Sequence, residues 1–297
     1  MFDTAAHHWI LAGVDGSRSA LDATRWAARE AARRHAPLRL FHACVLPPSA
    51  PRVPCALPGG AVEALVDYGH ALLRDAERVA LEAESGIEVE RELRVGNAAG
   101  GLIESSGAAR LVVLGSRGLG GFEGMLVGSV PAGVSAHGHC PVVVVRGRTP
   151  EDPPPRTGPV VVGVDGSPVS DSAVEFAFDA ASLRGVPLVA VHTWTDMSAG
   201  ETWSVLPFDI DYEAVAEDER RLLAERLAGW HEKYPDVEVR QRVLRDRPVH
   251  GLLEAAADAR LVVVGSRGRT ALKGVGLGST SQALLHHSAC PVAVVRP

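Results

Sequence analysis

The sequence of 297 residues lacks long apolar runs: its uninterrupted hydrophobic stretches span only a few residues, far short of the roughly 20 that a membrane helix needs. Its N-terminus lacks the basic-then-apolar order of a signal peptide. Lysine is almost missing, with only Lys233 and Lys273, and the formal net charge is −6, which argues against a surface for nucleic acid or anionic membranes. We therefore expect a cytoplasmic protein that binds neither nucleic acid nor membrane.

Other absences exclude classes of site. The four cysteines form no C-x-x-C pair and the twelve histidines show no His-x3-His spacing, so we expect no metal site. The Walker pattern G-x4-G-K-[ST] is missing, which argues against a P-loop NTPase. No clean G-x-G-x-x-G follows the first predicted strand, which weighs against a dinucleotide dehydrogenase. No Ser/His/Asp order or carboxylate pair can be argued, so we name no catalytic residue.

What is present is a repeat. The segment Gly13-Val14-Asp15-Gly16-Ser17 recurs 150 residues later, and so does Leu-Val-Val-x-Gly-Ser-Arg-Gly, at 111–118 and 261–268. Cys-Pro-Val recurs at 140–142 and 290–292 with the same offset. This period is far longer than that of solenoid repeats, so each copy is a whole domain. We predict one domain over residues 1–148, a proline-rich linker over 149–158 and a second domain over 159–297.

Each copy alternates short valine-rich runs with helical segments, the pattern of a parallel sheet that is buried on both faces. In the first copy we expect strands at 10–14, 38–43, 87–95, 111–114 and 142–145. The helices between them are expected at 18–35, about 61–84, 98–109 and 128–137, with Ser17 as the cap of the first. The fold class is α/β: two tandem domains, each a doubly wound parallel sheet with helices on both faces. Ligands of such sheets bind at the carboxyl ends of the strands.

The residues at those strand ends form a distinctive set. The fourth strand of each copy runs into Gly-Ser-Arg-Gly, at 115–118 and 265–268, and Gly-Ser opens the next helix, at 128–129 and 278–279. Glycines allow the backbone to approach a ligand, and a helix N-terminus favours phosphate. Asp15 or Asp165, after the first strand, can accept hydrogen bonds from a ribose. The set indicates a nucleotide site, although the glycines could also serve only tight turns and Asp15 could be a plain helix cap.

At this point the sequence resembles the universal stress protein family. The resemblance rests on Gly115-x2-Gly118-x9-Gly128-Ser129, on Gly-Val-Asp-Gly-Ser after the first strand and on Cys-Pro-Val before the last strand. Because both copies carry these motifs, the chain resembles a tandem-domain member. The resemblance implies a Rossmann-like, five-stranded parallel sheet in the order 3-2-1-4-5 in each domain, and one ATP with Mg²⁺ bound in each. We also expect a homodimer of tandem chains.

The resemblance also implies which residues contact the nucleotide. The aspartates would bond the ribose or adenine, the residue after the strand-two histidine would contact adenine through its backbone, and the glycine, serine and arginine positions would hold ribose and phosphates. The positions are Gly13, Asp15, Ala43, Gly115, Arg117, Gly118, Gly128, Ser129 and Val130 in the first copy, and Gly163, Asp165, Thr193, Gly265, Arg267, Gly268, Gly278, Ser279 and Thr280 in the second. One departure stands out: Pro131 removes a backbone N–H that domain two keeps at Ser281.

The functional expectation is an ATP-binding stress-response regulator without an efficient reaction of its own. No base or water-orienting residue is evident near the phosphate loop. A slow ATPase that switches between ATP and ADP states is the alternative, and a protein-interaction module that has lost nucleotide binding is a third reading.

Overall fold

The computed structural model describes residues 9–45, 60–118, 127–149, 152–195, 211–268 and 276–296. The chain divides into two compact units, Met1–Pro153 and Pro154–Pro297. The predicted linker, 149–158, spans the boundary between them, and its residues 150 and 151 lie outside the described residues. Among the helices that the structure describes, none is both long and apolar enough to cross a membrane.

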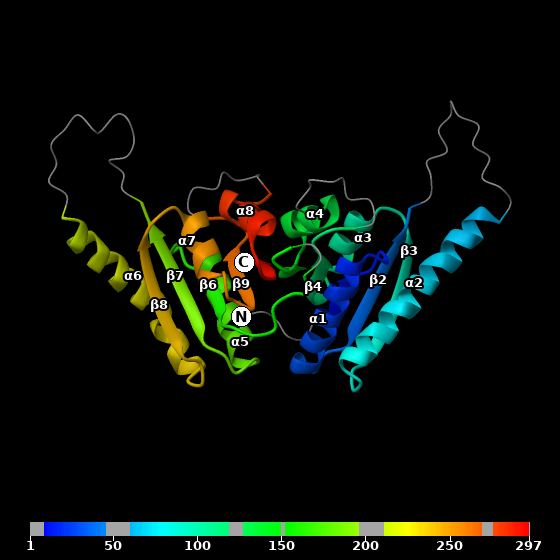
Figure 1. The fold of residues 1–297 in the computed structure, drawn as a ribbon, viewed down its shortest axis with the longest axis horizontal. Coiled ribbons are helices and arrows are strands. Elements are labelled where there is room, and N and C mark those ends of the chain that lie inside the picture. Colours follow the sequence, from blue (N-terminus) through cyan, green and yellow to red (C-terminus); the bar gives the residue numbers. More distant parts are fainter. Residues whose placement is uncertain are drawn as a thin grey trace, which may run out of the picture. The chain divides into compact units, whose positions relative to one another are not determined.

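The first unit is a five-stranded parallel sheet in the order β3-β2-β1-β4-β5. Its strands and helices alternate along the chain, as predicted (Figure 1). They are β1 (Trp9–Gly13), α1 (Arg18–Arg34), β2 (Leu38–Cys44), α2 (Ala61–Ala83), β3 (Val89–Val95), α3 (Ala98–Ser105), β4 (Ala109–Gly115), α4 (Ser129–His137) and β5 (Val142–Val145).

The second unit repeats this topology, with parallel strands in the order β8-β7-β6-β9-β10. Counted within the unit, this is again the order 3-2-1-4-5, so the predicted fold class is confirmed for both units. The elements are β6 (Val160–Gly163), α5 (Pro168–Ser182), β7 (Leu188–Trp194), α6 (Tyr212–Lys233), β8 (Val239–Arg245), α7 (Pro248–Ala255), β9 (Leu261–Gly265), α8 (Ser279–His287) and β10 (Val292–Val295).

The central strands are buried on both faces because helices cover both sides of each sheet, whereas the edge strands β3 and β8 are partly exposed. Ile10, Leu11 and Ala12 of β1 all have no exposed surface, although alternate side chains point to opposite faces. On β2 the two neighbours Phe41 and His42 show the two sides. A Cβ placed at Gly101 of α3 would touch the Phe41 ring, whereas one placed at Gly69 of α2 would touch His42. The α2 and α3 helices therefore pack on opposite faces.

The first helix of each unit starts where the sequence predicts. Ser17 is the N-cap of α1, and its hydroxyl accepts a hydrogen bond from Ala20 N at 3.2 Å. Ser167 caps α5 in the same way, and Pro168 occupies the first turn, where its missing N–H costs nothing. These caps fix the start of each helix directly after the strand end that carries the predicted aspartate.

The largest difference from a predicted boundary lies at the end of α3, while β3 begins two residues later than predicted and β4 two residues earlier. The helix expected over 98–109 ends at Ser105, and β4 already begins at Ala109. The Ser106 hydroxyl donates to Ile103 O at 2.6 Å and accepts from His139 N at 2.8 Å. These bonds close the helix and join it to the residue that leads into β5, so the chain turns four residues earlier than the apolar pattern suggested.

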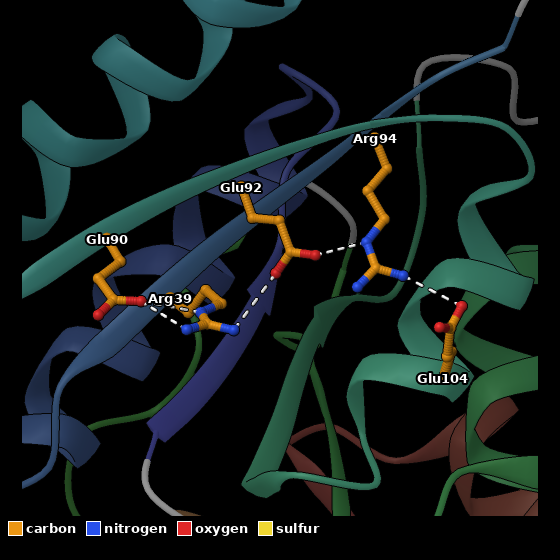
Figure 2. Close-up of polar contacts among 5 residues, drawn as sticks. All are labelled: Arg39, Glu90, Glu92, Arg94 and Glu104. Carbon is orange, nitrogen blue, oxygen red and sulfur yellow. Dashed lines mark hydrogen bonds and ion pairs between the residues drawn. The ribbon is translucent and has the colours of Figure 1, made fainter.

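Charged side chains form a row across β2 and β3 and reach α3 in the first unit (Figure 2). Arg39 binds Glu90 at 2.7 Å, and Arg94 binds Glu92 at 2.5 Å and Glu104 at 3.1 Å. Charged groups on an edge strand discourage pairing with another chain, and β3 ends the strand order of this unit. The row belongs to this unit alone, because Val189 and Leu244 replace the two arginines in the repeat.

Candidate functional site

A cleft of about 580 Å³ opens at the carboxyl ends of β1, β2 and β4 in the first unit. This volume lies within the range of sites for small molecules, about 300–1,000 Å³. All the residues predicted for the first site line this one cleft. They are Gly13, Asp15, Ala43, Gly115, Arg117, Gly118, Gly128, Ser129 and Val130. Residues that lie up to 117 positions apart in the sequence are thus brought together around one space.

Asp15 is held rigidly at the edge of this cleft. Its Oδ1 accepts a hydrogen bond from Ser17 N at 2.9 Å, while Oδ2 points to Gly118, where an added Cβ would lie only 2.5 Å away. The Ser17 hydroxyl also donates to Arg117 O at 3.3 Å. Asp15 therefore stabilises the turn before α1, although the N-cap of that helix is Ser17 and not Asp15, and in the same conformation the Asp15 carboxylate lines the cleft.

The N-terminus of α4 also lines the cleft. The N-cap is Gly128, and no side chain caps this helix. Gly128 N donates to Ser116 O at 2.8 Å, which anchors the turn to the loop after β4. The N–H groups of Ser129 and Val130 have no partner within an α-helix at these positions. Together with the helix dipole, they make this side of the cleft favourable for an anion.

Glycine occupies positions 115 and 128 of the cleft for different physical reasons. A Cβ at Gly115 would lie 2.6–2.8 Å from atoms of Ser19, including its backbone, so glycine is needed there for α1 to pack on β4. Gly128 has an ordinary extended conformation, φ −71° and ψ 162°, and its nearest neighbours to an added Cβ are 3.6 Å away. Among the described residues, none requires glycine at 128, and this position lines the cleft.

Apolar side chains that the sequence interpretation missed complete the walls. Phe41 and Leu114 come from β2 and β4, and Ala98 and Leu102 come from α3. A period-two reading of β2 places Phe41 on the same face as Ala43, so this wall could have been found from the sequence. Phe41, Leu102 and Leu114 are only 1–3% exposed, so they form an apolar floor of the cleft next to the polar end at α4.

The second unit repeats the polar framework at equivalent positions. Asp165 Oδ1 accepts from Ser167 N at 2.9 Å, and an added Cβ at Gly268 would lie 2.7 Å from Asp165 Oδ2. Gly278 N donates to Ser266 O at 2.8 Å and, as in α4, no side chain caps α8. Gly163, Thr193, Gly265, Arg267, Ser279 and Thr280 occupy the same strand ends and helix start as their counterparts in the first unit.

The departure at Pro131 is a modest one. Pro131 is the third residue of α4 and is buried, with no disruption of the helix. At this position a proline removes one of the N–H groups that would lack a helix partner anyway. In the second unit Ser281 keeps that N–H, and its hydroxyl donates to Gly265 O at 2.6 Å. The second helix start thus offers one more backbone donor than the first.

A group of titratable side chains lies just before α7 and along it, where the sequence interpretation expected no metal ligands. Asp246, His250 and Glu254 place their ligand atoms within 4.8 Å of one another. The 2.5 Å hydrogen bond between Asp246 and His250 lowers the pKa of Asp246 and raises that of His250. Arg242 lies 3.6 Å from Glu254. The charges are therefore compensated by the protein's own groups, and we assign no metal to this cluster.

The comparisons with known proteins agree with this architecture. The model of the universal stress protein family matches residues 8–146 and again 157–296. A universal stress protein of Mycobacterium tuberculosis is 41% identical over 290 residues, which cover 97% of this chain and 96% of the relative. One of Mycolicibacterium smegmatis is 42% identical over the full length of both chains.

A solved structure supports the fold independently. The universal stress protein from Archaeoglobus fulgidus aligns with a TM-score of 0.70 at 20% identity, over 97% of this chain and 98% of that chain. Taken with the two family matches, these findings show that the chain belongs to the universal stress protein family and carries two of its domains in tandem.

Proposed function

We propose that each unit binds one ATP with Mg²⁺ and that the protein is a stress-response regulator controlled by this occupancy. The observation that carries the proposal is the uncapped start of α4, which lines the same cleft as the Asp15 carboxylate and an apolar wall. An anion-binding end, a hydroxyl-binding carboxylate and a flat apolar surface are what a nucleoside triphosphate needs from its site.

The proposed roles follow the chemistry of each group. Asp15 and Asp165 accept hydrogen bonds from ribose or adenine, and the backbone at Ala43 and Thr193 faces adenine. The Gly-Ser-Arg-Gly loops and the starts of α4 and α8 hold ribose and phosphates, with Arg117 and Arg267 adding positive charge. Mg²⁺ arrives with the phosphates and keeps several of its waters, so hydroxyls such as Ser129 suffice beside it.

The lining of the cleft favours binding over hydrolysis. Among its described residues, Asp15 and Arg117 are the titratable groups, and Asp15 already accepts the Ser17 N–H. Hydrolysis needs a base or an amide that orients water at the γ-phosphate, which such a lining does not supply. A slow ATPase is the second candidate, and single-turnover hydrolysis of [γ-³²P]ATP against a protein-free blank separates the two.

The direct test is to quench the purified full chain in acid and to identify the released nucleotide by chromatography. We expect ATP, up to two per chain after incubation with millimolar MgATP. If no nucleotide is retained under that condition, the proposal is wrong and the chain acts through protein contacts alone. We also propose a homodimer of tandem chains, for which light scattering should give about twice 31.2 kDa; a value near 31.2 kDa would contradict it.

A further inference from the structure

A buried histidine lies directly behind the proposed second site. His192 of β7 is 2% exposed, and both of its ring nitrogens face oxygen atoms. Nδ1 lies 2.7 Å from Val164 O, and Nε2 lies 2.8 Å from Glu219 Oε2 on α6. The side chain of Glu219 is 25% exposed, so the carboxylate reaches from the surface of α6 to a buried ring.

The two strand ends that His192 joins are those that carry predicted nucleotide contacts. Val164 precedes Asp165 in the chain, and His192 precedes Thr193. Thr193 points to the opposite face of the sheet, where an added Cβ at Gly251 of α7 would touch it at 3.0 Å. The histidine and its carboxylate therefore support the site from behind and leave the ligand side open.

The first unit contains the histidine but lacks the carboxylate. His42 Nδ1 lies 2.7 Å from Val14 O, just as in the second unit. The residue equivalent to Glu219 is Gly69, and a Cβ there would lie 2.8 Å from His42 Cδ2 and 2.7 Å from Leu93 Cδ1. The α2 helix packs so closely on β2 that no side chain fits, so the His–Glu contact distinguishes the second unit.

Hydrogen-bond chemistry fixes how this contact works. A carbonyl oxygen only accepts, so Nδ1 must carry a proton to bind Val164 O. A proton must also lie between Nε2 and the Glu219 carboxylate. Without it, an unprotonated nitrogen and a carboxylate oxygen would face each other as two acceptors and repel. A ring that is held at both nitrogens cannot rotate, and the Val164 carbonyl that it binds is held with it. A carboxylate that orients a histidine in this way acts on whatever the histidine contacts.

We propose that His192 and Glu219 are positioning residues of the second nucleotide site: Glu219 fixes the imidazole, and the imidazole fixes the strand end that presents Asp165. The inference rests on the proposed function. A site whose supporting groups are locked loses less conformational freedom when ligand binds. The second site should therefore bind ATP more tightly than the first, where Gly69 leaves His42 without this support.

The test uses the full chain with the first site silenced by Gly118→Val, so that calorimetry with MgATP reports the second site alone. Glu219→Leu should weaken ATP binding by about fivefold or more, the factor expected for one net hydrogen bond. Glu219→Gln should stay within about twofold of the parent, because its amide N–H can donate to Nε2 while Nδ1 still donates to Val164 O. Glu225→Leu is the matched control on the same helix, because Glu225 is exposed there, and should change nothing.

Thermal unfolding of the same variants measures how much of the effect is general stability. Removing the carboxylate leaves the buried Nε2 of His192 without a partner, so Glu219→Leu should also lower the melting temperature. The positioning role requires that ATP affinity at the second site falls at a temperature where this variant is still fully folded. If Glu219→Leu does not fold, Glu219→Ala takes its place. If Gly118→Val does not fold, Asp15→Ala is used to silence the first site. If Glu219→Leu binds ATP as tightly as the parent, the positioning inference is wrong. It is also wrong if Glu219→Leu and Glu219→Gln lose the same amount of ATP affinity. Either result leaves the proposed function standing. If the parent binds no ATP at millimolar concentration, the proposed function fails first.

Discussion

Two glycines of the first site should respond in opposite ways to the same substitution. Gly128→Ala should leave the free energy of unfolding within about 0.5 kcal/mol of the parent, because an added Cβ finds its nearest neighbours at 3.6 Å and the backbone has φ −71°. The same variant should lower the affinity for ATP at the first site about tenfold or more, because the methyl group would occupy space beside the start of α4.

Gly115→Ala is the contrasting variant. Its Cβ would lie 2.7 Å from Ser19 C, so α1 would have to shift, and overpacking of this kind costs about 1–3 kcal/mol. Urea unfolding measures both stabilities, and calorimetry with MgATP measures affinity in a chain whose second site is silenced by Gly268→Val. If Gly128→Ala binds ATP like the parent, the cleft is not the nucleotide site. If Gly128→Ala destabilises the protein as much as Gly115→Ala, the assignment of separate roles is wrong.

Three further predictions test other features. Asp15→Ala should weaken ATP binding at the first site by about 1–3 kcal/mol, roughly 5- to 150-fold in affinity. If calorimetry shows the affinity of the parent, Asp15 only stabilises the turn. The bond between Asp246 and His250 raises the pKa of His250 and lowers that of Asp246, so the pair contributes stability between these two pKa values. The contribution is lost as pH rises through the raised His250 pKa and as pH falls through the lowered Asp246 pKa. An NMR titration should show the His250 midpoint fall in Asp246→Asn, and an unchanged midpoint would refute the pairing. Burial raises the pKa of the Cys140 thiol to about 12, so at pH 8 only about one thiol in ten thousand is ionised. Mass spectrometry should find Cys140 unalkylated by iodoacetamide in the native chain, and rapid modification would contradict its burial.

The sequence was most informative where the two copies share residues. The repeated Gly-Val-Asp-Gly-Ser and Gly-Ser-Arg-Gly segments fall at strand ends, and parallel strands bring their carboxyl ends to one edge, so the polar lining of the cleft followed from position alone. The buried valine runs with helices between them predicted a doubly wound parallel sheet, and the strand order came with the family resemblance.

What the sequence did not reveal depends on packing between segments far apart in the chain. The end of α3 at Ser105 is set by the bond between Ser106 and His139, which no local pattern indicates. The requirement for glycine at 115 comes from the Ser19 backbone of α1. The His192–Glu219 contact joins a strand to a helix 27 residues later, and Gly69 at the matching position gave no hint of it.

The most direct test of the central claim is a calorimetric titration of the full chain with MgATP. The proposal of one site in each unit predicts a stoichiometry near two, with the second site the tighter. In Gly118→Val and Gly268→Val, where a side chain would meet the Asp15 and Asp165 carboxylates, the stoichiometry should fall to one, with a different affinity left in each variant. The absence of binding at millimolar MgATP in the unmodified chain would contradict the claim.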